Sequence, residues 1–446
     1  MIISRVKRGP FNDGGLISLV GTLIAYGLIY SHVASFVTSK YGVPSTPLYL
    51  LVTALGLVLA TGIFTCRTQT SSSIKILAMV VAYVFILLAN LLFLDGSVFD
   101  LVRDRLSWAM VAIGGTVLLS NLRNPRQFLL ILRVVIIASA LIVLAEFFSG
   151  FSLPAMMTTV PGRAAGLFEN PNITGVFFTF ALPVVTIGLR PVHRAFWYGL
   201  TLTCVFLTFS RGGLALCALA ILLVEVFPVQ GGGSALMRRL VIGAVLVATA
   251  VPAYVLISTF IVSNFGSELD ANTIARARLE GDSSSDVRMY VLKLAWQEFS
   301  TSPIWGHGTG AADRWEADVS VHNQFGLIAM EYGVIGLAWF AAFLGTLWSM
   351  PRPFGIWATS MFVVAGMTLH NLFDGATYAL LLATYAALPA IFSAQLSQRP
   401  LSPSAARGPF SGRRRFRPPA IEPRGNLIRS VQGSLPQRPP GQGEGG

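Results

Sequence analysis

Four side chains that can bind an anion or accept a proton lie at or between the ends of long apolar segments of the chain. Arg163 and Arg211 each lie beside the end of such a segment. Arg288 lies in a polar stretch between two of them, and His322 directly precedes the second. Arginine stays charged and presents a planar fork of donors that matches phosphate oxygens, whereas histidine can accept a proton near neutral pH. The set therefore suits a substrate that carries a pyrophosphate and a second substrate whose hydroxyl group must lose a proton.

Further polar and small residues follow His322 at helical spacing. Asn323 adjoins the histidine and is expected to orient the substrate or the loop. Glu331 lies two turns further along an apolar run, so we predict that it pairs with a buried donor. Gly333 and Gly336 are predicted to let a neighbouring helix approach this run closely and so to fix its rotation.

Each charged residue also has a purely structural interpretation. An arginine at the end of a membrane span commonly anchors the helix, as Arg163 would, and a histidine at a helix start is commonly interfacial. Arg211 is harder to explain in this way, because the apolar run 195–209 before it would form a helix of about 22 Å. A bilayer core is about 30 Å thick, so Arg211 is expected below the outer surface, where an ionisable group is a candidate for function.

The elements that must position these side chains are membrane helices. Of the 446 residues, 54% are hydrophobic and 12% are charged, and the mean hydropathy is +0.66; a soluble protein averages about 45–50% and about 25%. This composition excludes a soluble enzyme, a disulfide scaffold and a disordered chain. It predicts an all-α polytopic membrane protein with about twelve transmembrane helices. The predicted spans are 15–37, 46–65, 74–94, 106–120, 128–148, 172–189, 195–209, 212–228, 240–262, 323–349, 353–371 and 376–394.

The longest polar stretch between spans, residues 263–322, is expected on the outer side of the membrane. An inner N-terminus places twelve lysines and arginines in the inner segments and nine in the tail, against ten outside, as the positive-inside rule requires. Within the loop, the run from Ser283 to Pro303 has capping residues at its start and apolar residues at helical spacing. It predicts an amphipathic helix that lies on the membrane surface over the bundle, and a second helix is expected at 267–280.

The last 48 residues have a different composition from the rest of the chain. Residues 399–446 contain nine arginines, nine prolines and two glutamates, which accounts for +7 of the net charge of +12. Such a segment cannot bury a core, so we predict a bundle domain at 1–398 followed by a disordered cytoplasmic tail. The tail is expected to lie at the anionic inner leaflet, and the positive charge does not imply a nucleic-acid partner.

The motifs together resemble the superfamily of O-antigen ligases and Wzy-type O-antigen and exopolysaccharide polymerases. The resemblance covers about 160–375, and four motifs occur in the family's order before or at the tenth span. They are the segment Arg163–Asn172 with Asn170-Pro171-Asn172, the Ser210-Arg211-Gly212-Gly213 turn, the Arg288 helix followed by Pro303, and His322-Asn323 followed by Gly333 and Gly336.

The resemblance implies a C-type glycosyltransferase architecture with one large periplasmic loop. Such an enzyme would transfer a glycan from undecaprenyl pyrophosphate to an acceptor glycan with inversion, and it would need neither a metal nor a cofactor. His322 matches the family's proposed base, and Arg211 and Arg288 match its pyrophosphate-binding arginines, with Arg163 as a third candidate. Asn172, Asn323, Glu331 and the two glycines would support them.

The acceptor remains open at the level of the sequence. A lipid-linked glycan would make the protein a polymerase of exopolysaccharide or O-antigen biosynthesis, working in the bacterial inner membrane, with a flippase and a chain-length regulator as potential partners. Lipid A core would make it a ligase of lipopolysaccharide biosynthesis. A flippase or other transporter without catalysis is the third interpretation, and it would place the polar residues near the bilayer midplane in paired, broken helices.

Overall fold

The computed structural model describes most of the chain from residue 13 to residue 392. The described residues are 13–60, 71–91, 99–122, 124–149, 162–168, 170–229, 259, 262–263, 283–314, 321–369 and 371–392. Within these ranges all regular secondary structure is helical, which confirms the predicted all-α class. The predicted second loop helix at 267–280 and the tail at 399–446 lie outside the described residues.

The helices follow the predicted apolar runs closely. Eleven of the twelve runs contain a described helix, and the run 240–262 lies mostly outside the described residues. The elements are α1 (Asp13–Ile24), η1 (Ala25–Tyr30), α2 (Val33–Tyr41), α3 (Thr46–Ala60), α4 (Ser71–Leu91), α5 (Phe99–Ser120), α6 (Pro125–Phe148), η3 (Gly166–Phe168), α7 (Pro171–Val185), α8 (Pro191–Leu207), α9 (Arg211–Val226), α12 (Ser283–Thr301), α13 (Ala311–Arg314), α14 (Gln324–Trp348), α15 (Phe354–Thr368) and α16 (Ala376–Ile391).

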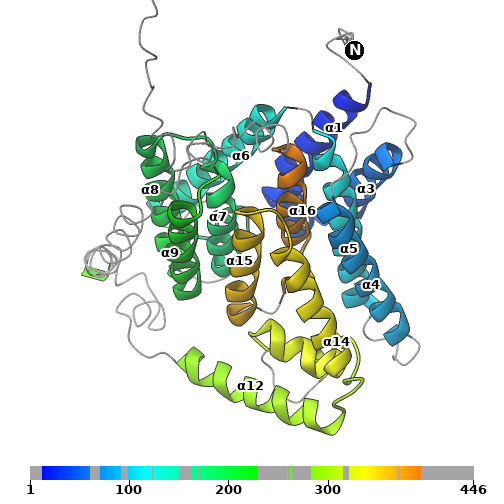
Figure 1. The fold of residues 1–446 in the computed structure, drawn as a ribbon. Helices are drawn as coiled ribbons and strands as arrows, with labels where there is room; N and C mark the ends of the chain where they lie inside the picture. The colour runs from blue at the N-terminus through cyan, green and yellow to red at the C-terminus, as the bar shows by residue number, and fades with distance from the viewer. Residues whose placement is uncertain are drawn as a thin grey trace, which may run out of the picture. The chain divides into compact units, whose positions relative to one another are not determined.

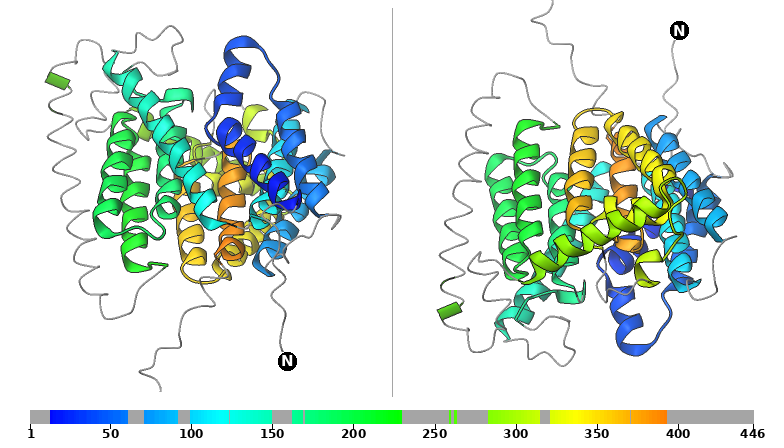
Figure 2. Two further views of the ribbon diagram at one scale, coloured as in Figure 1. Left: turned by 90° about the horizontal axis from the view of Figure 1, so that it is seen from above. Right: turned by 90° about the horizontal axis from the view of Figure 1, so that it is seen from below.

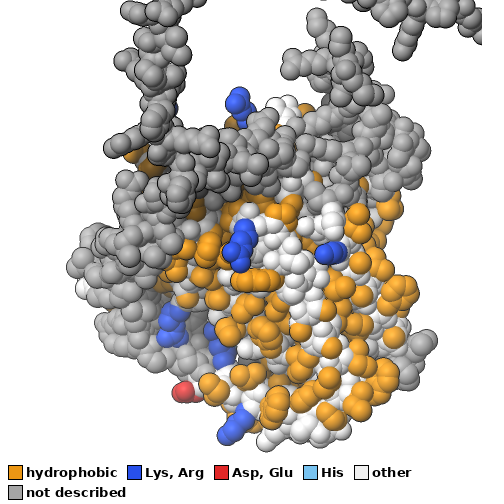
Figure 3. Space-filling view, in the orientation of Figure 1, with side chains coloured by type: hydrophobic (Ala, Val, Ile, Leu, Met, Phe, Trp, Pro, Cys, Tyr) orange, Lys and Arg blue, Asp and Glu red, His pale blue; other side chains and the backbone are white. Residues whose placement is uncertain are grey.

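Only some of the described helices are long enough to cross a bilayer unaided. Three have both the length and the mean hydropathy of a membrane span, namely Ser71–Asn90, Pro125–Phe148 and Gln324–Trp348. A fourth span results if Ser18–Tyr30, in α1 and η1, and Val33–Tyr41 of α2, which meet at a bend of 51°, count as one broken span. Large apolar side chains cover much of the surface of this part of the chain, with few charges among them (Figure 3). These features fit a helical membrane protein, and the number twelve stays a prediction.

Several helix starts are specified by short local motifs. In α6 and α7 an asparagine caps the helix and proline occupies its first position. These two residues together determine where each helix begins. The Asn124 side chain accepts from the Arg126 amide at 2.9 Å, and Asn170 accepts from the Asn172 amide at 2.9 Å. These caps fix the ends of α6 and α7 independently of how the helices pack.

Helix α16 lies at the centre of the bundle, between α5 on one side and α7 and α15 on the other (Figure 1). All the residues of α16 from Thr377 to Ile391 are buried. Helices α3 and α5 approach very closely where Gly56 faces Gly114, because a Cβ on Gly56 would lie 2.6 Å from the Gly114 Cα. Small residues at such crossings are typical of packing between membrane helices.

Helix α12 crosses one end of the bundle instead of joining it (Figures 1 and 2). Its bounds, Ser283–Thr301, match the helix predicted between Ser283 and Pro303. Val291 and Ala295 on its inner face are buried in a small apolar cluster with Val321, Leu327 and Met330. This cluster fixes α12 to the loop before α14 and to the first turns of α14.

Helix α14 is interrupted at Gly333, and this corrects the predicted role of the two glycines. Gly333 has φ 61° and ψ −151°, and a Cβ there would collide with the backbone of the turn at Pro303, whose carbonyl accepts from the Val334 amide at 2.8 Å. Gly336 faces Tyr332 of its own helix across the break. The close neighbour of Gly333 is therefore a turn, not a second helix, and the prediction of helix–helix approach was wrong.

Candidate functional site

A polar pocket lies at the end of the bundle that α12 crosses. Asn172 from α7, Arg211 from α9 and Arg288 from α12 line it together, and Thr368 and Leu369 at the end of α15 close one side. The structure thus brings together three residues that are far apart in the sequence and were predicted to serve one site. Two of them are arginines, so the pocket suits an anion with several oxygens.

Arg211 is held in place by the tight turn between α8 and α9. Phe209 is buried and has φ 46°, a left-handed conformation that bulky residues rarely adopt. The Ser210 hydroxyl then accepts from the Gly213 amide at 3.2 Å and caps α9, which makes Arg211 the first residue of the helix. The positive end of the helix dipole therefore adds to the positive charge of Arg211.

The two glycines after Arg211 leave space where the turn meets its neighbours. A Cβ on Gly212 would lie 3.3 Å from the Thr368 side chain, and one on Gly213 would lie 3.1 Å from Val205. Both distances are tighter than ordinary van der Waals contact. The Ser-Arg-Gly-Gly sequence is thus needed for α9 to begin this close to α8 and α15.

Arg163 lies behind the pocket, which differs from its predicted role as a pyrophosphate ligand. Its side chain is buried, with 2% exposure, and does not line the pocket. The Nε donates to the Thr208 carbonyl at 2.7 Å, and an Nη donates to the Asn172 Oδ1 at 3.0 Å. Arg163 therefore joins the end of α8 to the start of α7 and positions Asn172, because its guanidinium is directed at protein acceptors in the interior.

Arg288 is placed by the packing of α12 on the start of α14. Val291, one turn after Arg288, lies in the same apolar cluster as Val321, and Val321 directly precedes His322. A Cβ on Gly326 would lie 2.9 Å from Leu292, so the two helices are in close contact here. The packing of α12 on α14 thus has two results. It places Arg288 at the pocket, and it holds the segment that contains His322 next to α12.

His322 precedes α14 on the same side of the molecule. Its neighbour Asn323 caps α14 by accepting from the Gly326 amide at 2.9 Å, and donates through Nδ2 to the Met367 carbonyl at 3.5 Å. The residue after Met367 is Thr368, which lines the arginine pocket. The junction of loop and α14 is therefore held against the wall of the pocket, and the contribution of Asn323 is to fix that junction.

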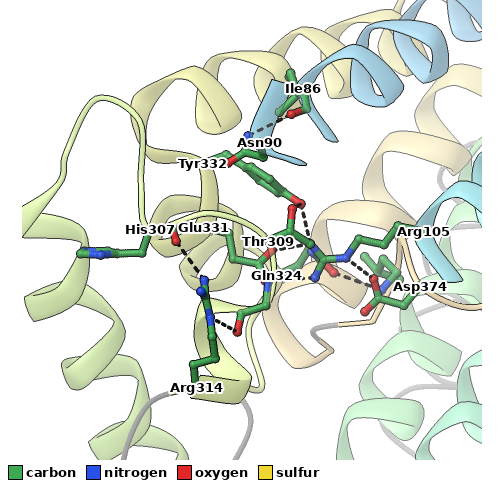
Figure 4. A network of polar contacts seen from close by, with 12 residues as sticks. Ile86, Asn90, Arg105, His307, Thr309, Arg314, Gln324, Glu331, Tyr332 and Asp374 are labelled. Atoms are coloured by element: carbon green, nitrogen blue, oxygen red, sulfur yellow. Dashed lines mark hydrogen bonds and ion pairs between the residues drawn. The ribbon is translucent and has the colours of Figure 1, made fainter. Parts of the chain in front are cut away.

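A second group of charged residues surrounds Arg105, where α5, α14 and the segment after α15 meet (Figure 4). The Arg105 guanidinium donates to both Glu331 oxygens, at 2.6 and 3.1 Å, and to Asp374 at 2.9 Å. It also donates to the Tyr332 hydroxyl, and Glu331 accepts from the Gly310 amide at 2.7 Å. The prediction that Glu331 pairs with a buried donor is confirmed.

The segment between α12 and α14 is a glycine turn attached to that group. Gly306, Gly308 and Gly310 all have positive φ, between 69° and 83°, and the Gly308 amide donates to the Glu331 carbonyl at 2.8 Å. His307 contacts the Glu298 carbonyl through Nε2 at 2.8 Å and is not part of the pocket. The turn thus links the C-terminal end of α12 to the break in α14.

Comparison with known proteins identifies the segment that carries most of this site. Residues 196–341 match the family model described as O-antigen ligase. This segment of the chain is therefore similar to the O-antigen ligases. No curated protein matches the chain. The match confirms the resemblance seen in the motifs and indicates a bacterial membrane enzyme of the ligase or polymerase type that acts on lipid-linked glycans.

The O-antigen ligase segment includes Arg211, Arg288 and His322 but not every residue of the site. Asn172 and Arg163 come from α7 and the loop before it, and Thr368 comes from the end of α15. The pocket is therefore completed by parts of the chain on both sides of the matched segment.

The sequence did not indicate a role for Arg105, because the predicted span 106–120 leaves it in the loop before that span. It lies in α5, which begins at Phe99, seven residues before the predicted run, and its side chain is 2% exposed. The run was cut short because charged residues lower the local hydropathy even when a buried partner neutralises them. Glu331 inside an apolar helix was the available signal, because a buried carboxylate requires a cationic partner.

Proposed function

We propose that the protein is a glycosyltransferase of the bacterial inner membrane. In this proposal it transfers a glycan from undecaprenyl pyrophosphate to an acceptor sugar on the periplasmic face, with inversion at the anomeric carbon. The observation that carries the proposal is the pocket in which Arg211, Arg288 and Asn172 meet beside the His322 junction. The family match supports the reaction class.

The pyrophosphate of the donor binds in the pocket. Arg211 and Arg288 approach it from different helices, and each can bind two oxygens through its planar guanidinium. The N-terminus of α9 adds backbone amides and the positive end of the helix dipole. Asn172, held by Arg163 at 3.0 Å, provides a neutral donor.

The transfer step uses His322 as the base. The histidine accepts the proton of the acceptor hydroxyl as the hydroxyl oxygen forms a bond to the anomeric carbon. The bond from that carbon to the pyrophosphate oxygen breaks on the opposite face, which inverts the configuration. The electron pair leaves with the pyrophosphate, whose added negative charge Arg211 and Arg288 stabilise, so positive side chains take the place that a metal ion has in other phosphate-dependent transferases.

The acceptor in this proposal is a second lipid-linked glycan, which makes the protein an exopolysaccharide or O-antigen polymerase. A flippase would then supply the donor, and a chain-length regulator would set the product length. Transfer to lipid A core instead would make the protein a ligase with the same donor chemistry. Incubating the purified protein with one donor and each acceptor in turn decides between the two.

The test of the mechanism is His322→Ala in a purified system with a synthetic lipid-pyrophosphate donor. General-base catalysis contributes about 10²–10⁴-fold, so turnover should fall by that factor while donor binding is retained. The assay is run with and without a chelator. Turnover like the wild type, or loss of wild-type activity with the chelator, would disprove the proposed histidine mechanism.

The proposed orientation has both termini in the cytoplasm and residues 263–322 outside, with a bundle domain at 1–398. A single cysteine at Ser267 should react with an impermeant reagent in intact spheroplasts, whereas a single cysteine at Ser404 should react only after lysis. Labelling at both positions in intact cells would mean that the number of spans is odd.

A further inference from the structure

A second hollow also borders α12. It has a volume of about 660 Å³ and runs between α12 and the first turns of α14. Met289, Leu292 and Trp296 form its wall, and Gly326 and Ala329 lie on its α14 side. The wall residues are three and seven positions apart, so they follow one another along one side of α12, and the groove runs along the helix.

The groove leaves large apolar side chains uncovered. Met289 is 67% exposed, Trp296 65% and Tyr290 60%, although all three line a concave surface. The charged side chains of Asp286 and Lys293 also border the groove. Aromatic residues and a lysine beside an apolar surface are typical of protein at the level of lipid headgroups.

The groove and the arginine pocket are lined by neighbouring residues of α12. Arg288 lines the pocket, and Met289, the next residue, lines the groove. From Arg288 to Trp296 the helix rises by about 12 Å. A ligand with a pyrophosphate at Arg288 therefore meets this apolar wall directly if its tail follows α12.

We propose that the groove binds the first isoprenoid units of the donor's lipid carrier; this rests on the proposed function. Its volume lies in the usual range of ligand sites, about 300–1,000 Å³, and such sites combine a mainly apolar lining with a few polar groups. Side chains of methionine, leucine, tryptophan and alanine offer an isoprenoid chain extensive apolar contact. A glycan would need hydrogen-bonding groups all along the wall, whereas the lining is mainly apolar and its polar groups are those of Asp286, Lys293, Tyr290 and Trp296.

The experiment uses the full chain in nanodiscs with a polyprenyl pyrophosphate that carries a benzophenone on its second isoprene unit. After irradiation, mass spectrometry should locate the label on α12 and α14 peptides, and undecaprenyl phosphate should compete with it. Trp296→Glu and Met289→Asp place a charge in the wall at exposed positions and should each weaken labelling at least tenfold. The matched control is Trp305→Glu, because Trp305 is 71% exposed but does not line the groove, and it should change labelling less than threefold.

Three results would overturn the assignment of the groove. They are labelling that maps elsewhere, equal loss in Trp305→Glu and Trp296→Glu, and competition by a free oligosaccharide instead of undecaprenyl phosphate. Glycan transfer is measured on the same samples. Groove labelling in a protein that transfers no glycan would reject the proposed function and leave the lipid site. Glycan transfer without groove labelling would reject the lipid site and leave the proposed function.

Discussion

Arginines at one end of this molecule occupy two contrasting settings. Arg105 is buried, and its guanidinium is directed at two carboxylates and a tyrosine hydroxyl from α14 and the segment after α15. Arg211 and Arg288 are only partly buried and line an open pocket. In the first setting carboxylates of the protein neutralise the arginine, and in the second the two arginines border a pocket.

The contrast shows how structural and binding arginines can be told apart when both lie at helix ends. A buried arginine with two carboxylate partners is neutralised by the protein, so its removal should be measured as lost stability. An arginine that lines a pocket should be dispensable for folding and needed for the substrate. Arg163 belongs with the first kind, because it is buried and donates to a backbone carbonyl and to Asn172.

The largest effect is expected for Arg105→Met. The substitution leaves Glu331 buried and Asp374 partly buried without their counterion. Loss of one partner of a buried ion pair typically costs about 3–5 kcal/mol, so both thermal stability and abundance should fall sharply. Arg103→Met is the control on the same helix, because its ion pair with Asp104 joins side chains that are 50% and 54% exposed and is worth at most about 1 kcal/mol. Equal melting temperatures for the two variants in detergent would mean that the buried arginine stabilises the protein no more than the exposed one.

Gly333→Ala should have the next largest effect. The residue has φ 61° and ψ −151°, a region open almost only to glycine, with a penalty of about 1–3 kcal/mol, and the added Cβ would meet the turn at Pro303. Gly326→Ala is the control, since its Cβ would meet side-chain atoms of Leu292 and Val321 instead of backbone. Thermal unfolding should separate the two, and a stable Gly333→Ala protein would show that the break in α14 is not required.

Arg211→Lys and Arg288→Lys should affect the reaction without affecting stability. Lysine keeps the charge but loses the planar fork, and hydrogen bonds to charged groups contribute about 1.5–3 kcal/mol. Transfer should therefore fall about tenfold to a hundredfold, with accumulation of lipid-linked precursor in cells and normal protein abundance. If both lysine variants are fully active, the two arginines are membrane anchors.

The smallest effect is expected for Asn172→Ala. The Asn172 side chain lines the pocket and accepts from Arg163, and one such hydrogen bond is worth about 0.5–1.5 kcal/mol. The KM for the donor should rise about threefold to tenfold, with little change in kcat. A change in kcat alone would place Asn172 at the reacting centre and not at the pyrophosphate.

Much of the molecule follows from the sequence alone. Eleven of the predicted apolar runs contain a described helix, because the backbone of an apolar membrane segment satisfies its hydrogen bonds within the segment and needs no distant partner to become helical. Asn170-Pro171 and Ser210 fix where α7 and α9 begin through contacts within three residues. The spacing of His322, Gly333 and Gly336 pointed to the superfamily.

What the sequence could not decide is which charged residue faces a ligand and which faces the protein. Arg105 is 226 positions from Glu331 and 269 from Asp374, and no local pattern reports such a pair. The same holds for the pocket, whose residues come from α7, α9, α12 and the end of α15. Residue type sets what a side chain can bind, but whether an arginine is neutralised inside the protein or directed at a substrate depends on distances that only the packing of the helices sets.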